Sequence, residues 1–143
     1  MDATPTLEDA LILAAEAHRG QVDKAGKPYI LHPIRVMLRG NSHDECIAAL
    51  LHDIVEDTAV TFDELRARGY SETVVAAVDG LTKREGEAYE AFVSRAAIHP
   101  VARAVKLADI ADNMDLTRLP HITEEDRERL ARYEAARLVL SNP

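Results

Sequence analysis

Apolar residues recur at helical spacing in segment after segment of this chain of 143 residues. Capping residues such as Thr6, Thr61 and Ser71, together with glycines and prolines, separate the segments from one another. Aromatic residues, which favour strands, make up only 4% of the chain. The spacing predicts about eight helices, over residues 7–18, 33–40, 44–58, 61–69, 71–80, 87–98, 101–114 and 124–140. We therefore expect one all-α, bundle-like domain over residues 1–143.

The composition excludes several classes of function. Seventeen Lys and Arg residues against twenty-five Asp and Glu residues give a net charge of −8, which disfavours binding to nucleic acid polymers or anionic membranes. No apolar run approaches the ~20 residues of a membrane span, and the N-terminus lacks a signal-peptide pattern. Cys46 is the single cysteine, so neither an internal disulfide nor a Cys-rich zinc site is expected. We expect a cytoplasmic protein; the sequence does not define an oligomeric state.

The segment from His52 to Asp57 concentrates four ionisable side chains directly after the apolar run 48–51. On a continuous helix of ~100° per residue, Glu56 lies ~40°, Asp53 ~100° and Asp57 ~140° from His52. Carboxylates crowded beside an imidazole repel one another and lose hydration if they are buried. A divalent cation would relieve that repulsion, since it accepts both nitrogen and oxygen ligands. A solvated acidic helix end is the alternative interpretation.

Two further residues could complete a metal site. Asp109 shares a helix face with Asn113, and an aspartate at such a position is more often an i,i+4 partner or a cap than a metal ligand. His32 lies at a loop-to-helix junction, where a hydrogen-bonded core histidine is the simpler interpretation. Joined to His52 and Asp53, they would supply two imidazoles and two carboxylates, which suit Mn, Fe, Co, Ni or Zn better than Ca or Mg. Coordination positions open to water would allow such an ion to acidify a water for hydrolysis.

The order H…HD…D of these residues resembles HD-domain metal-dependent phosphohydrolases. Longer strings narrow the resemblance to the hydrolase domain of the RelA/SpoT alarmone enzymes and to free-standing small alarmone hydrolases. The strings follow the family's order from about Leu7 to Met114, and they are His18-Arg19-Gly20-Gln21, Gly26-Lys27-Pro28-Tyr29-Ile30-Leu31-His32-Pro33, Ala48 to Thr58, Leu81-Thr82-Lys83, Val105 to Asp109, and Asn113-Met114. The RelA/SpoT synthetase and regulatory regions have no room in 143 residues, so hydrolysis alone is expected.

The resemblance implies an HD-domain fold and assigns roles to individual residues. It implies a divalent metal, usually manganese, bound by His32, His52, Asp53 and Asp109. It further implies that Glu56 and Asp57 position and activate the attacking water, and that Lys24 and Asn113 contact the nucleotide. The implied reaction removes the 3′-pyrophosphate of ppGpp or pppGpp, the alarmones of the stringent response, and gives GDP or GTP with pyrophosphate.

The expected substrate site departs from the family at the base. Asp23 replaces an arginine that commonly packs on the guanine ring, and Ala25 replaces a frequent serine. A carboxylate cannot stack on a base, but it could accept hydrogen bonds from guanine or from an adenine amino group. Residues 18–39 still carry an excess of four positive charges. These charges could bind a polyphosphate, and five solvated surface cations are an equally good interpretation. Lys83 could add to this basic rim.

Three alternative functions follow from the same residues. The chain could hydrolyse adenine alarmones, (p)ppApp, because the base contact has changed. It could be an HD phosphatase of nucleoside monophosphates or of a nicotinamide dinucleotide phosphate, which would release orthophosphate rather than pyrophosphate. It could also be a catalytically silent nucleotide sensor. The presence of both Glu56 and Asp57 argues against a sensor, since a binding protein gains little from two carboxylates near a phosphate.

Overall fold

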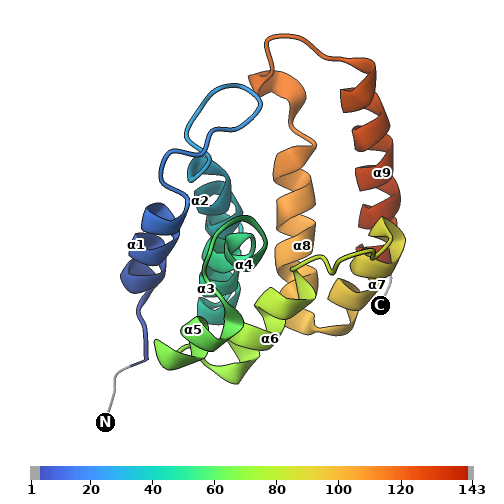
Figure 1. Cartoon of the computed structure of the whole chain (residues 1–143). Coiled ribbons are helices and arrows are strands. Elements are labelled where there is room, and N and C mark those ends of the chain that lie inside the picture. Colours follow the sequence, from blue (N-terminus) through green and yellow to red (C-terminus); the bar gives the residue numbers. More distant parts are fainter. Residues whose placement is uncertain (1–3, 142–143) are drawn as a thin grey trace.

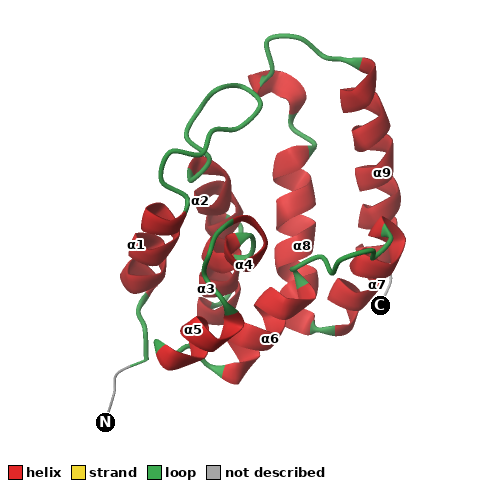
Figure 2. Ribbon diagram, in the orientation of Figure 1, coloured by secondary structure: helices red, strands yellow, loops and turns green. Residues whose placement is uncertain are grey.

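The computed structural model describes residues 4–141, which form helices joined by loops (Figures 1 and 2). The helices within these residues are α1 (Leu7–Ala17), α2 (Leu31–Leu38), α3 (His43–Leu51), α4 (Ile54–Asp57), α5 (Phe62–Ala67), α6 (Glu72–Gly80), α7 (Tyr89–Ile98), α8 (Pro100–Asn113), the 3-10 turn η1 (Leu116–Arg118) and α9 (Glu124–Ser141). One isolated bridge joins Val22 to Pro28, and no strand forms in the described part of the chain. The all-α prediction is confirmed.

Side chains that cap helices define most of the predicted boundaries. Thr6 forms a capping box with Asp9 at the start of α1, and the hydroxyl groups of Ser42, Thr61 and Ser71 accept the backbone N–H three residues later in α3, α5 and α6. These bonds satisfy amide groups that have no partner inside the helix, which is why the helices begin there.

The predicted helix 44–58 is wrong at its centre, because the structure divides it into α3 and α4. His52 and Asp53 form the turn between the two helices, with Asp53 at φ −104° and ψ 2°. The His52 side chain is hydrogen-bonded to the backbone carbonyl of Ala49, at 2.6 Å. Glu56 and Asp57 therefore lie on a separate short helix, and their orientation does not follow the continuous helical wheel. This division accounts for nine α-helices where about eight are expected in residues 4–141.

Helix α3 forms the centre of the bundle and packs against α1, α2, α6 and α8. Its side chains Ile47, Leu50 and Leu51 are fully buried. Helix α9 packs against α7 and α8 through a separate apolar cluster of Val93, Ile110, Ala136 and Leu140. No helix among the described residues is both long and apolar enough to cross a membrane.

Two irregular segments meet at one end of this bundle. The long loop between α1 and α2 and the segment that contains η1 both lie at the upper end of the molecule in Figure 1. Their residues line a common cavity of about 450 Å³. The helices thus supply rigid walls, and the loops supply the rim, of the candidate site.

Candidate metal centre and active site

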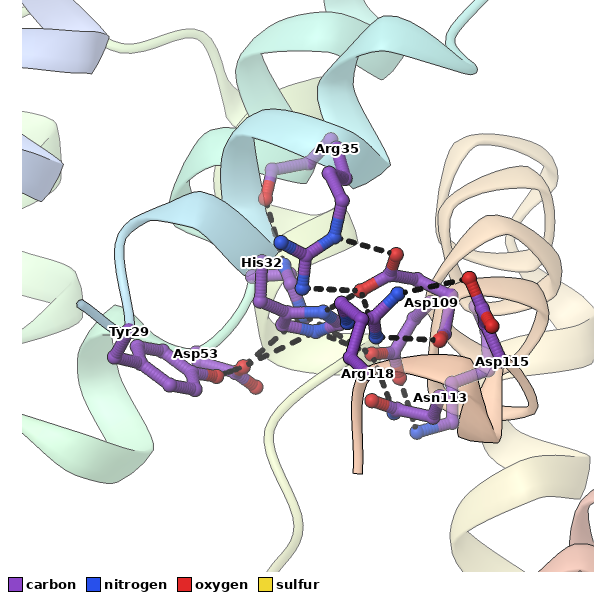
Figure 3. Close-up of polar contacts among 12 residues, drawn as sticks. Tyr29, His32, Arg35, Asp53, Asp109, Asn113, Asp115 and Arg118 are labelled. Carbon is purple, nitrogen blue, oxygen red and sulfur yellow. Dashed lines mark hydrogen bonds and ion pairs between the residues drawn. The ribbon is translucent and has the colours of Figure 1, made fainter. Parts of the chain in front are cut away.

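The four residues predicted to bind metal converge between α2, the turn after α3, and α8. Figure 3 labels three of them, His32, Asp53 and Asp109. Ligand atoms of His32, His52 and Asp109 all lie within 4.8 Å of one another, and all three residues are buried. Asp53 Oδ2 lies 3.1 Å from His52 Nε2 and 4.0 Å from His32 Nε2. Asp109 Oδ1 lies 2.8 Å from His32 Nε2 and 3.4 Å from His52 Nε2. Residues separated by up to 77 positions in sequence therefore form one cluster.

Hydrogen bonds fix both imidazole rings so that Nε2 faces the carboxylates. His52 Nδ1 lies 2.6 Å from the carbonyl oxygen of Ala49, an acceptor only, so Nδ1 carries the proton. His32 Nδ1 lies 2.6 Å from Asp112 Oδ2, which likewise accepts. The His52 Nε2 atom is buried and has no hydrogen-bond partner, although two carboxylates lie beside it. Two nitrogen lone pairs facing two carboxylates repel one another unless a cation lies between them, so the donor set fits a divalent metal.

The pKa values of these groups indicate a strongly negative pocket. Burial alone would lower the pKa of His52, but the neighbouring carboxylates of Asp53 and Asp109 raise it well above its ordinary value. Burial would likewise raise the pKa of Asp109, yet Lys106 and the two histidines hold it well below the usual range. The site thus favours positive charge at the histidines and keeps Asp109 ionised, as a metal ligand must be.

Residues around the cluster hold its carboxylates in place. Tyr29 donates a hydrogen bond to Asp53 Oδ2, and burial followed by the charge of Asp53 raises the pKa of the phenol, which therefore stays protonated. Lys106 Nζ lies 3.0 Å from Asp109 Oδ2 and 4.6 Å from the centroid of the Phe92 ring. Asn113 Nδ2 donates to Asp109 Oδ1 over 3.1 Å. Figure 3 shows Tyr29 and Asp53 on one side of His32, with Asp109 and Asn113 on the other.

Sequence reasoning missed Asp112, which is hydrogen-bonded to His32 and to Arg35. The signal was available, because Asp112 follows Asp109 by three positions and therefore shares its helix face. The sequence alone does not predict that α2 places His32 against that face of α8.

The cavity of about 450 Å³ opens beside this cluster and holds several of the predicted substrate-binding residues. Lys24, Asp23 and Asn113 line it, together with Arg35 and Arg118. Asp23 also organises its own loop, because its Oδ1 accepts the backbone N–H groups of Ala25 and Lys27, both at 2.9 Å. Four predicted site residues, His52, Glu56, Asp57 and Lys83, are outside the cavity lining.

The exposed pair Glu56 and Asp57 lies on α4, directly after His52 and Asp53 in sequence. Glu56 Oε1 accepts the backbone N–H of Lys83 over 2.8 Å, so the acidic pair and the Lys83 loop are adjacent. Arg95 holds that loop through the backbone carbonyls of Asp79 and Thr82. Burial and the charges of Asp53 and Glu56 raise the pKa of Asp57 to about 6. A carboxylate with this pKa is suited to exchange protons near neutral pH.

Fold and cluster together define a helical protein with a buried His, His and Asp metal-type centre. The chain matches the HD domain family over residues 10–112, which is more than half of its length. It therefore belongs to the HD domain family.

Relatives extend this assignment. The chain is 36% identical over 138 residues to the guanosine-3′,5′-bis(diphosphate) 3′-pyrophosphohydrolase of Aquifex aeolicus. The alignment covers 88% of this chain and 19% of that protein. It is 30% identical over 146 residues to the bifunctional (p)ppGpp synthase/hydrolase SpoT of Escherichia coli K12, covering 92% of this chain and 20% of SpoT. The chain thus spans about a fifth of the length of these relatives.

Among solved structures, the chain resembles a metazoan ortholog of SpoT that hydrolyses ppGpp and plays a role in starvation responses. The TM-score is 0.80 at 25% identity, and the alignment covers 99% of this chain and 89% of that one.

Proposed function

We propose that this chain is a manganese-dependent hydrolase that removes the 3′-pyrophosphate of (p)ppGpp in the cytoplasm. The observation that carries the proposal is the cluster of His32, His52, Asp53 and Asp109, of which all but His52 line the cavity of about 450 Å³. A fold shared with a ppGpp-hydrolysing SpoT ortholog supports the choice of substrate.

In this proposal His32, His52, Asp53 and Asp109 hold the metal, which when bound supplies acidification of water and neutralisation of phosphate charge. Asp57, with a pKa of about 6, accepts a proton from the attacking water, and Glu56 helps to orient that water. The water oxygen bonds to the phosphorus atom that carries the 3′ oxygen, and the bond between that phosphorus and the 3′ oxygen breaks. The 3′ oxygen takes up a proton from Asp57 or from solvent, so the products are GDP or GTP and pyrophosphate.

The cavity wall supplies the contacts to the nucleotide. Lys24 and Asn113 line the cavity and are proposed to bind the substrate, and Lys83 is proposed to approach it from the loop beside Glu56. Cationic side chains of this kind compensate the charge of a polyphosphate.

The test is a manganese-supplemented assay of the purified protein with ppGpp and ppApp side by side, resolving nucleotides and released phosphate species. GDP with pyrophosphate is the expected result. ADP with pyrophosphate from ppApp alone would assign the adenine alarmones instead. Orthophosphate would indicate an HD phosphatase, and nucleotide binding without turnover would indicate a sensor.

A variant of Asp53 tests whether the activity depends on the four proposed metal ligands. We expect Asp53→Ala to lose metal binding and hydrolysis together, whereas Asp63→Ala, which changes an exposed aspartate on α5, keeps both. Full activity in the Asp53 variant would contradict the role of the cluster.

A further inference from the structure

Asp112 is a buried acid outside the four proposed metal ligands. It lies on α8, only 3% exposed, and its Oδ2 atom lies 2.6 Å from His32 Nδ1. The opposite nitrogen of the same ring, Nε2, faces Asp109 Oδ1 at 2.8 Å. The imidazole therefore has one nitrogen in the metal cluster and the other on Asp112.

Two arginines fix the Asp112 carboxylate. Arg35 donates from Nε to Oδ1 over 2.7 Å and from Nη2 to Oδ2 over 3.1 Å, a bidentate pair. Arg118 Nη2 donates to the Asp112 backbone carbonyl over 3.0 Å and lies 3.6 Å from Oδ2. The carboxylate is thus oriented, and its charge is paired with the Arg35 guanidinium.

An ionised acceptor on Nδ1 has two consequences for His32. It keeps the proton on Nδ1, so the lone pair of Nε2 points into the cluster, and its negative charge makes the ring a stronger electron donor. We infer that Asp112 is a positioning residue that sets the tautomer and orientation of His32 and thereby raises the affinity of the centre for a divalent metal. This inference rests on the metal dependence in the proposed function.

A purely structural role makes a different prediction. Asp112 connects α2 to α8 through Arg35 and His32, so its loss could weaken helix packing without changing how the centre binds metal. Metal affinity and folding stability must therefore be measured separately on the same variants.

The experiment compares wild-type protein with Asp112→Asn and Asp112→Ala. Mn²⁺ dissociation constants are measured by titration calorimetry without nucleotide, and unfolding temperatures are measured in EDTA. Asp126→Asn is the matched control, because Asp126 is also a buried aspartate paired with an arginine, Arg129, but makes no hydrogen bond or ion pair with a proposed ligand. We expect Asp112→Asn to raise the Mn²⁺ dissociation constant by ~10–100-fold and Asp112→Ala at least as much. The control should keep the wild-type constant.

A second measurement does not depend on how the variants fold. In wild-type protein loaded with diamagnetic Zn²⁺, the ¹⁵N spectrum should show His32 protonated at Nδ1 and metal-bound through Nε2. Wild-type affinity in a folded Asp112→Asn variant, protonation at Nε2, or absence of divalent metal binding by the wild type would each overturn the inference. If the wild type binds Mn²⁺ but leaves ppGpp intact, only the proposed substrate fails.

Discussion

The Gln21 side chain donates a hydrogen bond from Nε2 to the backbone carbonyl of Asp57, over 3.1 Å and 36 positions of sequence. Its Oε1 lies 2.8 Å from Nδ1 of the buried His18, and the His18 ring lies beside Tyr29 at a centroid distance of 5.0 Å. The end of α1 is thus connected to the end of α4, which carries the proposed catalytic acids. Gln21 in this arrangement fixes the backbone of Asp57 relative to the bundle.

Replacing Gln21 should therefore affect catalysis more than substrate binding. Gln21→Glu keeps an acceptor for His18 but loses the donor to the Asp57 carbonyl, and we expect kcat to fall by ~10-fold with little change in KM, because a small displacement of a catalytic group lowers the rate steeply. The free energy of unfolding should fall by ~1–2 kcal/mol. Steady-state kinetics with ppGpp and urea unfolding check both, and an unchanged kcat would show that this hydrogen bond does not position Asp57.

The raised pKa of Asp57 sets the expected pH dependence of the rate. If Asp57 accepts the proton of the attacking water, kcat/KM should rise with pH and level off above about pH 6, as the carboxyl loses its proton. Glu56→Gln removes one of the neighbouring charges that raise this pKa, so the midpoint of the remaining activity should move to lower pH. Rate profiles between pH 4.5 and 8, at saturating Mn²⁺, measure the shift. A midpoint that stays in place would contradict the coupling between the two acids.

The same pKa shift makes Asp57 unfavourable for stability at neutral pH. Its pKa is raised from the ordinary 3.8 to about 6 in the folded protein, so the folded state holds the proton more tightly than the unfolded chain does. The protonated Asp57 carboxyl therefore stabilises the folded protein relative to the ionised one. This contribution is complete below the unfolded pKa of 3.8 and is lost as the pH rises through about 6. Asp57→Asn should thus be more stable than wild type at pH 7.5 by ~1 kcal/mol, a value reduced for the exposure of the side chain.

Urea unfolding of the metal-free proteins at pH 7.5 and pH 3.5 tests this stability difference. The gain should shrink at the lower pH, where Asp57 is protonated in the folded state and mostly protonated in the unfolded chain. Asp63→Asn, at an exposed site on α5, serves as the control and should show no comparable gain at either pH. A gain of equal size at both pH values would assign the effect to something other than the Asp57 charge.

The sequence predicts those parts of this fold that depend on local pattern. Helix starts at Thr6, Thr61 and Ser71 follow from short-range capping bonds, and the apolar period identifies the buried faces. The break at His52 could not be predicted in this way. It involves a side-chain bond to Ala49 and contacts of Asp53 with Tyr29, which belongs to a distant loop. Tertiary contacts override the helical propensity of that segment.

The same distinction between local pattern and tertiary contact applies to the residues of the candidate site. The residue types and their order indicate the four metal-type ligands, and the structure brings them together. The partners that orient those ligands depend on which helices become neighbours. The spacing of residues within a helix does not predict that α2 packs against α8 at Asp112. The turn formed by Asp23 is local, but its hydrogen bonds go to backbone amides, whose direction follows from loop conformation rather than from residue type.

That turn changes what is expected from substitutions at Asp23. Oδ1 of Asp23 accepts the N–H groups of Ala25 and Lys27, so it shapes the loop that carries Lys24 to the cavity. Asp23→Asn keeps the side-chain oxygen acceptor and should leave KM within ~3-fold of wild type, whereas Asp23→Arg removes it and should raise KM for ppGpp and ppApp alike by ~10-fold. Steady-state kinetics with both nucleotides separate this effect from direct base recognition. A lower KM for ppGpp alone in the arginine variant would instead show that this position selects the base by stacking on guanine.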